Sequence, residues 1–566
     1  MVQFFKVIIL VFFLVSAGCK KNNADPEPDT GEYSGSFRWD FQYGTDGFSN
    51  STGEQCTSER GCLLWSQTPD SYLTGPEQLN IPAGKWQTVE LRLSGTAATL
   101  KLFWKKKGET NLQTVSIPLI ADGQSHDYQI ELGQNDHWTG TIHQLLFQTE
   151  SNGQIAIDFI RLTGLYLVTF PGLSSHFETD RAQLNELKNF FSEADKSVVI
   201  GFSAHTEYLV TNDNGDYLYY RYRDENAAGL LNPHYLVRLA KTTRMPVMIW
   251  LRGDPWGDVS DNTQLFADDR HLMWTAEITA QPAYRDNRSG YRYLCLAQEE
   301  VDGTTPLYWQ QTDKLLGQCA EEVGKLIREN PDYILGVTTT SEYKFNAENQ
   351  TVDLDYNPKT IREFRDYCQQ KYVTLSALNN LCGTDFATFE LRSSDFNPLT
   401  VEAENGFDAP RTRGVPAAFW KEWKTFRAQQ IHKAVRRQVD CIAQHIDGKY
   451  IYTHQIASED DPIASPAFCG NVEGANVGID LFTHEATEST IREISSFVKS
   501  QPYRSWGIPE WLVLRDGNPE QTVQAMKLMR KYGVKYLTPF CWGFGDEFDI
   551  KGSPAFDAVR KYLKDY

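Results

Sequence analysis

Apolar and polar residues alternate in short stretches between about Ser36 and about Gly164, and turn residues separate these stretches. Examples are Trp86–Leu93, Thr99–Trp104 and Gln154–Leu162. An apolar side chain at every second position is typical of a strand with one face against a core. Helical spacing is almost absent from this part of the chain. We therefore predict a β-sandwich over residues 36–165.

The pattern changes at about Leu165, where strand-like stretches begin to alternate with amphipathic helices. Trp309–Glu329 and Trp420–Ile446 carry apolar residues at helical spacing on one face. Strands separated by crossover helices predict a (β/α)8, or TIM, barrel over residues 166–566. The third predicted strand is the least regular, and Leu167–Phe170 is the alternative. The predicted strands are Val198–Ala204, Val247–Arg252, Tyr291–Ala297, Ile334–Glu342, Tyr450–Gln455, Val477–His484, Arg504–Glu510 and Tyr536–Trp542.

The chain opens with a targeting segment. The apolar run Val7–Val15 is too short to cross a bilayer as a helix, and small residues follow it before Cys19. This arrangement resembles a bacterial lipoprotein signal, in which Cys19 becomes the acylated first residue; an ordinary signal peptide cut nearby is the alternative. We predict a signal peptide over residues 1–18, a flexible tether over 19–35, and an exported, membrane-anchored lipoprotein.

Charge and cysteine content exclude several classes of protein. The 55 basic and 74 acidic residues give a formal net charge of −19, which argues against nucleic acid as a partner. No phosphate-binding loop and no zinc-type cysteine spacing occurs, so we expect neither a cofactor nor a metal. Cys56 and Cys62, two of the 10 cysteines, lie close in one loop and are the predicted disulfide.

Two glutamates end predicted barrel strands. Glu342 closes Ile334–Glu342, and Glu510 lies in Trp506–Trp511. Side chains at the C-terminal ends of barrel strands meet at one mouth. Two carboxyl groups there, one protonated and one ionised, are what the hydrolysis of a glycosidic bond requires. A structural salt bridge is the alternative role for each glutamate.

Several motifs of the barrel region resemble the clan A glycoside hydrolases, and they are most similar to family 42 β-galactosidases. The resemblance implies that Glu342 is the acid/base and Glu510 the nucleophile of a retaining mechanism. It also implies an oligo- or polysaccharide substrate, with a β-galactoside, a galactan, an agar-like polymer and another plant or algal glycan as equal alternatives. The motifs are Ile334–Glu342, Tyr356–Tyr367, Lys371–Asn379, Tyr452–Gln455, Trp506–Trp511 and Thr538–Trp542.

One departure from this family concerns Ser341, which stands where the clan usually has an asparagine that binds the sugar 2-hydroxyl. The shorter side chain could keep part of that contact or indicate another sugar. It is also the best support for a second hypothesis, a surface glycan-binding protein without catalytic activity. A third hypothesis is an inverting enzyme on the same barrel, which the separation of the two carboxyl groups would decide.

Further residues are predicted to bind substrate because they follow barrel strands or flank the two glutamates. A structural ion pair is an equal alternative for Arg252 with Asp254, and a structural role is the alternative for each histidine. These candidates are Arg252, Asp254, Trp256, His205, His454, His484, Trp506, Trp511 and Trp542.

The N-terminal sandwich resembles jelly-roll modules that are appended to polysaccharide-degrading enzymes, and such modules often bind sugars. The phrases that carry this resemblance include Leu102–Trp104, Trp138–Gly140 and Ile157–Leu162. Four tryptophans could stack on sugar rings, but a role in the sandwich core is the stronger prediction for each. They are Trp39, Trp65, Trp104 and Trp138.

Overall fold

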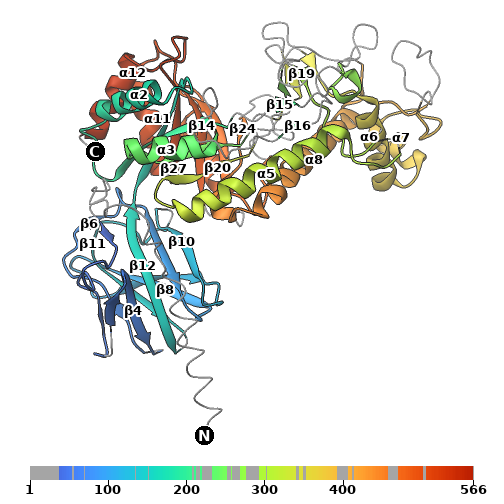
Figure 1. Ribbon diagram of the computed structural model, residues 1–566. Coiled ribbons are helices and arrows are strands. Elements are labelled where there is room, and N and C mark those ends of the chain that lie inside the picture. The colour runs from blue at the N-terminus through green and yellow to red at the C-terminus, as the bar shows by residue number, and fades with distance from the viewer. Residues whose placement is uncertain are drawn as a thin grey trace.

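A computed structural model describes residues 37–564, apart from a set of internal gaps. These gaps are residues 54–55, 69, 134, 151, 207–209, 212–216, 219–231, 252–255, 258–267, 276–291, 301, 340–342, 344, 348–351, 392–405, 411–413, 457–469 and 501–504. The N-terminal β domain lies at one end of the barrel domain (Figure 1).

The N-terminal domain is a sandwich of two antiparallel sheets, as the alternating pattern predicts. All four tryptophans proposed as stacking platforms lie in its core and are at most 9% exposed, so they cannot stack on a ligand. One sheet contains β1 (Arg38–Trp39), β3 (Cys56–Glu59), β4 (Cys62–Gln67), β7 (Thr88–Ser94), β10 (Ser125–Glu131) and β12 (Gly153–Thr163). The other contains β2 (Ser49–Asn50), β5 (Leu73–Thr74), β6 (Ile81–Pro82), β8 (Thr99–Lys106), β9 (Leu112–Pro118) and β11 (Thr141–Thr149).

The predicted pairing of Cys56 with Cys62 is wrong. Cys62 takes part in a disulfide, whereas Cys56 is a free thiol. The two cysteines lie on the two strands of a hairpin but are not opposite each other, because Cys56 pairs in register with Trp65 and Cys62 with Glu59. The two cysteines are close in sequence, but the register of the hairpin keeps them from being paired residues.

The second domain is a closed barrel of parallel strands. Its fifth strand is broken into β23 and β24, of which β23 pairs with β20 and β24 with β25, so that the sheet closes on itself. The strands are β13 (Leu165–Pro171), β14 (Val198–His205), β17 (Val247–Trp250), β20 (Ile334–Thr338), β23 (Ile451–Tyr452), β24 (Gln455–Ile456), β25 (Val477–Phe482), β26 (Trp506–Leu512) and β27 (Val534–Trp542). The predicted (β/α)8 barrel is confirmed.

One predicted strand is wrong, and its alternative is correct. Leu165–Pro171 forms the first barrel strand, β13, directly after Gly164. Tyr291–Ala297 is not a barrel strand: β19 (Arg292–Tyr293) instead pairs with β18 (Trp256–Gly257) in a two-stranded sheet outside the barrel. Short apolar stretches of this kind pair equally well in a hairpin or in a barrel, so their pattern alone does not separate the two.

Helices cross over between the barrel strands. Two long ones, α5 and α8, run side by side beyond the barrel and carry α6 and α7 at their far end (Figure 1). The helices are α2 (Phe177–Phe190), α3 (Pro233–Thr243), α5 (Leu307–Glu329), α6 (Pro358–Tyr372), α7 (Leu375–Cys382), α8 (Ala417–Ala443), α10 (Glu488–Ser500), α11 (Pro519–Lys531) and α12 (Pro554–Lys564). The loops add β15 (Val210–Thr211), β16 (Tyr217–Leu218), β21 (Asn346–Ala347), β22 (Val352–Asp353), η1 (Asp269–His271) and η2 (Gly448–Tyr450). Among the helices described, none is long and apolar enough to span a membrane.

A charged interface joins the sandwich to the end of the barrel at which its strands begin. Glu90 of β7 accepts hydrogen bonds from Arg161 at 2.6 Å and from Tyr166 of β13 at 2.8 Å. Lys535, at the start of β27, lies 3.8 Å from Glu90, and Arg161 also pairs with Asp332 before β20 at 2.7 Å. The opposite end of the barrel, where the strands finish, faces away from the sandwich.

Replacing Glu90 with glutamine is expected to lower the free energy of unfolding by about 3 kcal/mol at neutral pH. Burial alone raises the pKa of Glu90, but the charges of Arg161 and Lys535 and hydrogen bonds from Tyr166 and Arg161 lower it from 4.5 to about 2. The folded pKa is the lower one, so this stabilisation is present above pH 4.5 and is lost as the pH falls towards 2.

Denaturant titrations of Glu90→Gln and the unmodified protein measure this effect. The difference between them should be largest at neutral pH and should close as the pH approaches 2. Glu109→Gln, at a side chain that is 50% exposed, is the control and should change little. Equal unfolding midpoints at neutral pH would contradict the role assigned to Glu90.

Candidate active site

Glu510 lies near the C-terminal end of β26, the seventh barrel strand, with its side chain 15% exposed. The register of β26 shifts against both of its neighbours just before this residue. Because of these shifts, Glu510 turns towards His454 and Asp480, while Trp511 beside it has no exposed surface. The irregular strand thus presents a carboxylate at the barrel mouth.

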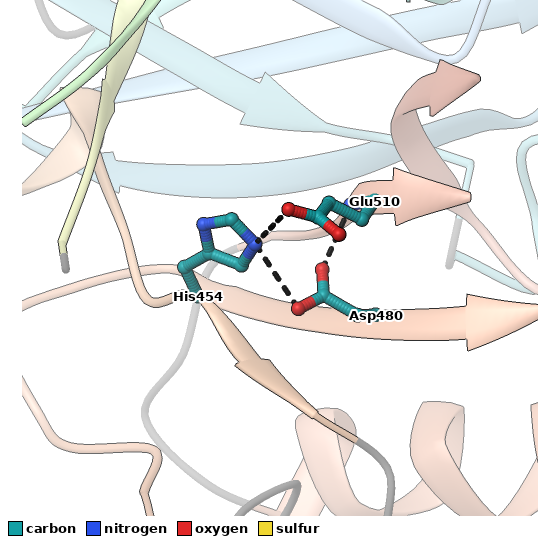
Figure 2. Close-up of side chains that lie close together, drawn as sticks. All are labelled: His454, Asp480 and Glu510. Carbon is teal, nitrogen blue, oxygen red and sulfur yellow. Dashed lines mark hydrogen bonds and ion pairs between the residues drawn. The ribbon is translucent and has the colours of Figure 1, made fainter. Parts of the chain in front are cut away.

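Two buried side chains, Asp480 and His454, contact Glu510 (Figure 2). Asp480 of β25 accepts the backbone N–H of Glu510 at 2.7 Å through one oxygen. Its other oxygen lies 3.0 Å from Nε2 of His454, and the same nitrogen lies 3.6 Å from Oε1 of Glu510. A single imidazole nitrogen therefore faces both carboxylates.

His454 reaches this position because the fifth strand is broken. Thr453 donates its backbone N–H to Asn476 at 2.9 Å, and its hydroxyl accepts the N–H of Gly478 at 2.9 Å. A Cβ atom on Gly478 would lie 1.8 Å from the carbonyl oxygen of Thr453, so only glycine allows this approach. The hydroxyl of Thr453 thus takes the place of a backbone acceptor for β25 at the break between β23 and β24, where His454 lies.

The exposure of the three side chains separates their roles. His454 and Asp480 are 1% and 2% exposed, whereas Glu510 is 15% exposed. Only Glu510 of the three is open enough to touch a substrate, and the other two fix its direction. An imidazole N–H, or an imidazolium when protonated, also offsets the repulsion between two close carboxylates.

Part of the chain matches the sequence model of a known family of enzymes. Residues 282–477, which include β20, β23, β24 and His454, match the family described as β-galactosidase, glycoside hydrolase family 42. This part of the barrel is therefore similar to a glycoside hydrolase of clan A. No curated protein sequence matches the chain.

Solved structures of such hydrolases resemble the chain at low identity. A β-galactosidase from Bacillus circulans sp. alkalophilus has a TM-score of 0.46 at 12% identity, covering 71% of this chain and 55% of that one. A β-galactosidase from the psychrophilic Marinomonas ef1 has a TM-score of 0.42 at 14% identity, covering 70% and 58%. The catalytic domain of a β-amylase from Paenibacillus polymyxa has a TM-score of 0.46 at 12% identity, covering 71% and 98%. The chain thus spans little more than half the length of the two β-galactosidases.

Of the three histidines predicted to bind substrate, two contact Trp250, and one of these two, His454, lies beside Glu510. His454 contacts Trp250 edge-on with a ring separation of 4.8 Å, and His205 at the end of β14 lies 4.8 Å from the same indole. His484 is exposed and packs against Phe482, with ring centroids 5.3 Å apart.

The three tryptophans predicted as pocket walls are instead part of the core. Trp506, Trp511 and Trp542 are at most 1% exposed and belong to the cluster shared by the barrel strands and their helices. Trp506 donates to the backbone of Tyr532 at 3.1 Å, and Trp542 lies edge-on to Phe190 of α2 at 5.3 Å. The prediction for these rings is wrong because they point outwards from the barrel, not into its mouth.

Other predicted residues lie outside the described part of the chain, and for them the predictions stand untested. They are Cys19, Arg252, Asp254, Ser341 and Glu342, together with the side chain of Trp256. Thr338, which ends β20, pairs in register with Trp250 and Tyr452 at the mouth end of the barrel.

Asp480 is a residue of the candidate site that the sequence alone did not reveal. Its signal was an isolated carboxylate inside the apolar stretch Val477–Phe482. A buried charge in such a stretch needs a partner, and here the partners are His454 and the backbone of Glu510. Together the three side chains also offer one ligand atom each within 4.8 Å of one another, so they could hold a divalent cation. A cation bound there would coordinate the carboxylate of Glu510. That carboxylate would then be less able to attack the anomeric carbon of a sugar.

Proposed function

We propose that the protein is a retaining glycoside hydrolase that cleaves β-galactosidic bonds in a plant or algal oligo- or polysaccharide. The observation that carries this proposal is the accessible Glu510, oriented by buried His454 and Asp480 at the end of the seventh strand. The match of residues 282–477 to the family 42 enzymes supports it independently.

The mechanism assigns one step to each glutamate. Glu510 attacks the anomeric carbon, while Glu342 donates its proton to the departing glycosidic oxygen. A glycosyl–enzyme ester then links the sugar to Glu510. Glu342, now ionised, removes a proton from water, and this water displaces Glu510 and releases the sugar with its original anomeric configuration.

The residues around Glu510 suit the nucleophile in this scheme. The backbone N–H of Glu510 is held by Asp480 at 2.7 Å, which fixes the strand that carries the carboxylate. His454 approaches one carboxylate oxygen of Glu510 at 3.6 Å. Positioning of this kind lowers the entropic cost of reaching the transition state.

Hydrolysis assays test the proposal. A panel of aryl β-glycosides, galactans and agar-type polymers should show cleavage by the unmodified protein and none by Glu342→Gln or Glu510→Gln. Circular dichroism and thermal unfolding of both variants check that they remain folded. Binding of a glycan by the unmodified protein, without release of reducing ends from any substrate, would favour the surface-binding hypothesis and direct attention to Ser341.

Replacing His454 with glutamine is expected to lower kcat by up to roughly 100-fold, because a misplaced catalytic group loses about that much. His454 acts through Glu510, so KM should change little and the acid limb of the kcat–pH profile should shift. His484→Gln, at an exposed histidine, is the matched control and should match the unmodified enzyme. A loss in His454→Gln with an unshifted pH profile would indicate a structural role only.

We further propose that acylation of Cys19 anchors the enzyme to a bacterial membrane. The proposal rests on the apolar run Val7–Val15 and the small residues that follow it. Cys19→Ala is expected to move the protein from the membrane fraction to the soluble fraction without changing its activity. Labelling with an alkyne fatty acid should mark the unmodified chain alone. Retention of Cys19→Ala in the membrane fraction would contradict lipid anchoring.

A further inference from the structure

An exposed phenylalanine lies at the mouth end of the barrel, just after β27. Phe544 is 46% exposed, although its ring is stacked on Phe170 with centroids 5.7 Å apart and planes at 23°. Phe540 of β27 stacks on the same Phe170 ring at 5.1 Å and 30°. These three rings, Phe170, Phe540 and Phe544, form an apolar surface that we call the rim shelf.

The rim shelf is continuous with the site around Glu510. Phe170 stacks on Trp250 at 4.7 Å and 27°, and Trp250 meets His454 edge-on at 4.8 Å. His454 in turn lies 3.6 Å from Glu510. A series of side chains in contact therefore runs from the solvent at Phe544 to the carboxylate that the proposed mechanism uses.

The loop that carries Phe544 is held on both sides of the ring. Gly543 and Gly545 have φ values of 82° and 77°, in the left-handed region that favours glycine. Asp549, which is 5% exposed, accepts the N–H of Gly543 at 2.8 Å and that of Gly545 at 2.7 Å. A Cβ atom on Gly172 would lie 3.3 Å from the Phe544 ring, so the backbone just after β13 packs against the ring.

This fixed position makes the shelf suited to binding. A large apolar side chain that is left open to water gains free energy when another apolar surface covers it. Because the loop is already ordered, little conformational entropy remains to be lost when that happens. Within the proposed function, the surface that reaches the barrel mouth is a sugar chain, and one face of a pyranose ring carries mainly C–H groups.

We propose that the rim shelf is a stacking subsite for a hexopyranose ring of the polysaccharide substrate. The proposal rests on the proposed function and extends it. The contacts that join Phe544 to His454 pass through Phe170 and Trp250. In this proposal the ring on Phe544 is a different sugar unit from the one attacked by Glu510. The shelf thus selects for substrates of several units over single-sugar glycosides.

Kinetics on substrates of different length test this subsite. For Phe544→Ala, the ratio of kcat/KM on galactan or agar-type oligosaccharides to kcat/KM on an aryl β-galactoside should fall roughly fivefold to tenfold. Phe544→Leu, which keeps apolar volume but has no ring, should fall similarly, and Phe544→Tyr should restore the ratio. Leu514→Ala is the control: Leu514 follows β26 at the same end of the barrel and is 44% exposed, and its replacement should leave the ratio unchanged.

A binding measurement separates this proposal from the proposed function. In the Glu510→Gln background, calorimetry with the same oligosaccharides should show the same loss of affinity when Phe544→Ala is added. Binding that depends on Phe544 in a protein that hydrolyses nothing would leave the subsite standing and overturn the function. Hydrolysis with an unchanged length ratio would overturn the subsite alone. A protein that neither binds nor cleaves any member of the panel would overturn both.

Discussion

Replacing Glu510 with glutamine is expected to lower kcat by on the order of 10⁴-fold or more on every substrate, whatever its leaving group. The amide keeps the size of the side chain and can still face His454, but it cannot form the ester with the anomeric carbon. Loss of the nucleophile affects the first chemical step, so an aryl glycoside with a good leaving group gains nothing. Stopped-flow and steady-state assays on dinitrophenyl and nitrophenyl β-galactosides measure the effect.

A smaller side chain at this position tests the retaining mechanism directly. Glu510→Gly leaves space beside the anomeric carbon, so added azide should restore turnover of an activated glycoside and give the α-glycosyl azide. NMR of the product reads the configuration. A β-configured azide, or activity of Glu510→Gln close to that of the unmodified enzyme, would contradict the assignment of Glu510 as nucleophile.

Replacing Glu342 with glutamine is expected to lower kcat/KM, which reports the first chemical step, by roughly 10²–10⁴-fold, but only where the leaving group needs a proton. Natural polysaccharides and alkyl glycosides should lose nearly all activity. A dinitrophenyl glycoside needs no proton on departure, so its first step should remain fast and the glycosyl–enzyme should accumulate. The alkaline limb of the pH profile, which reports the acid form of Glu342, should disappear as well.

The same azide experiment distinguishes the two glutamates from each other. With Glu342→Ala, azide should accelerate breakdown of the glycosyl–enzyme and give the β-glycosyl azide, because Glu510 still forms the ester. Mass spectrometry of the trapped intermediate should place the sugar on Glu510. A uniform loss of kcat/KM on good and poor leaving groups would remove Glu342 from the acid/base role.

The domain architecture and the seventh strand were predictable because their patterns are regular over many residues. Period-two alternation ended where Gly164 joins the sandwich to β13, and helical spacing followed. The first barrel strand was obscured because β12 and β13 are separated by that single glycine and read as one apolar stretch. The false strand at Tyr291–Ala297 has the composition of a barrel strand but pairs, through Arg292 and Tyr293, in a hairpin.

Side-chain direction was the part of the site that the sequence could not reveal. Alternation along β26 would place Glu510 and Ile508 on one face, but the register shifts between Ile508 and Trp511 interrupt it. Whether Trp506 faces the mouth or the helices depends on these register shifts, and the types of residue along the strand do not predict where such shifts occur. His454 was found by its place after a strand, whereas its partner Asp480 was hidden inside one.

The two ends of the barrel differ. The end where the strands begin is covered by the sandwich through the charged interface, and the end where they finish carries Glu510 and the rim shelf. The first strand described, β1, belongs to the sandwich. Its Arg38 lies 3.4 Å from Asp332, at the end of the barrel where the strands begin. A lipid on Cys19 would therefore be attached through the sandwich, whereas the rim shelf lies at the other end of the barrel. We expect a protein anchored in this way to act on long polymers that arrive from the surroundings.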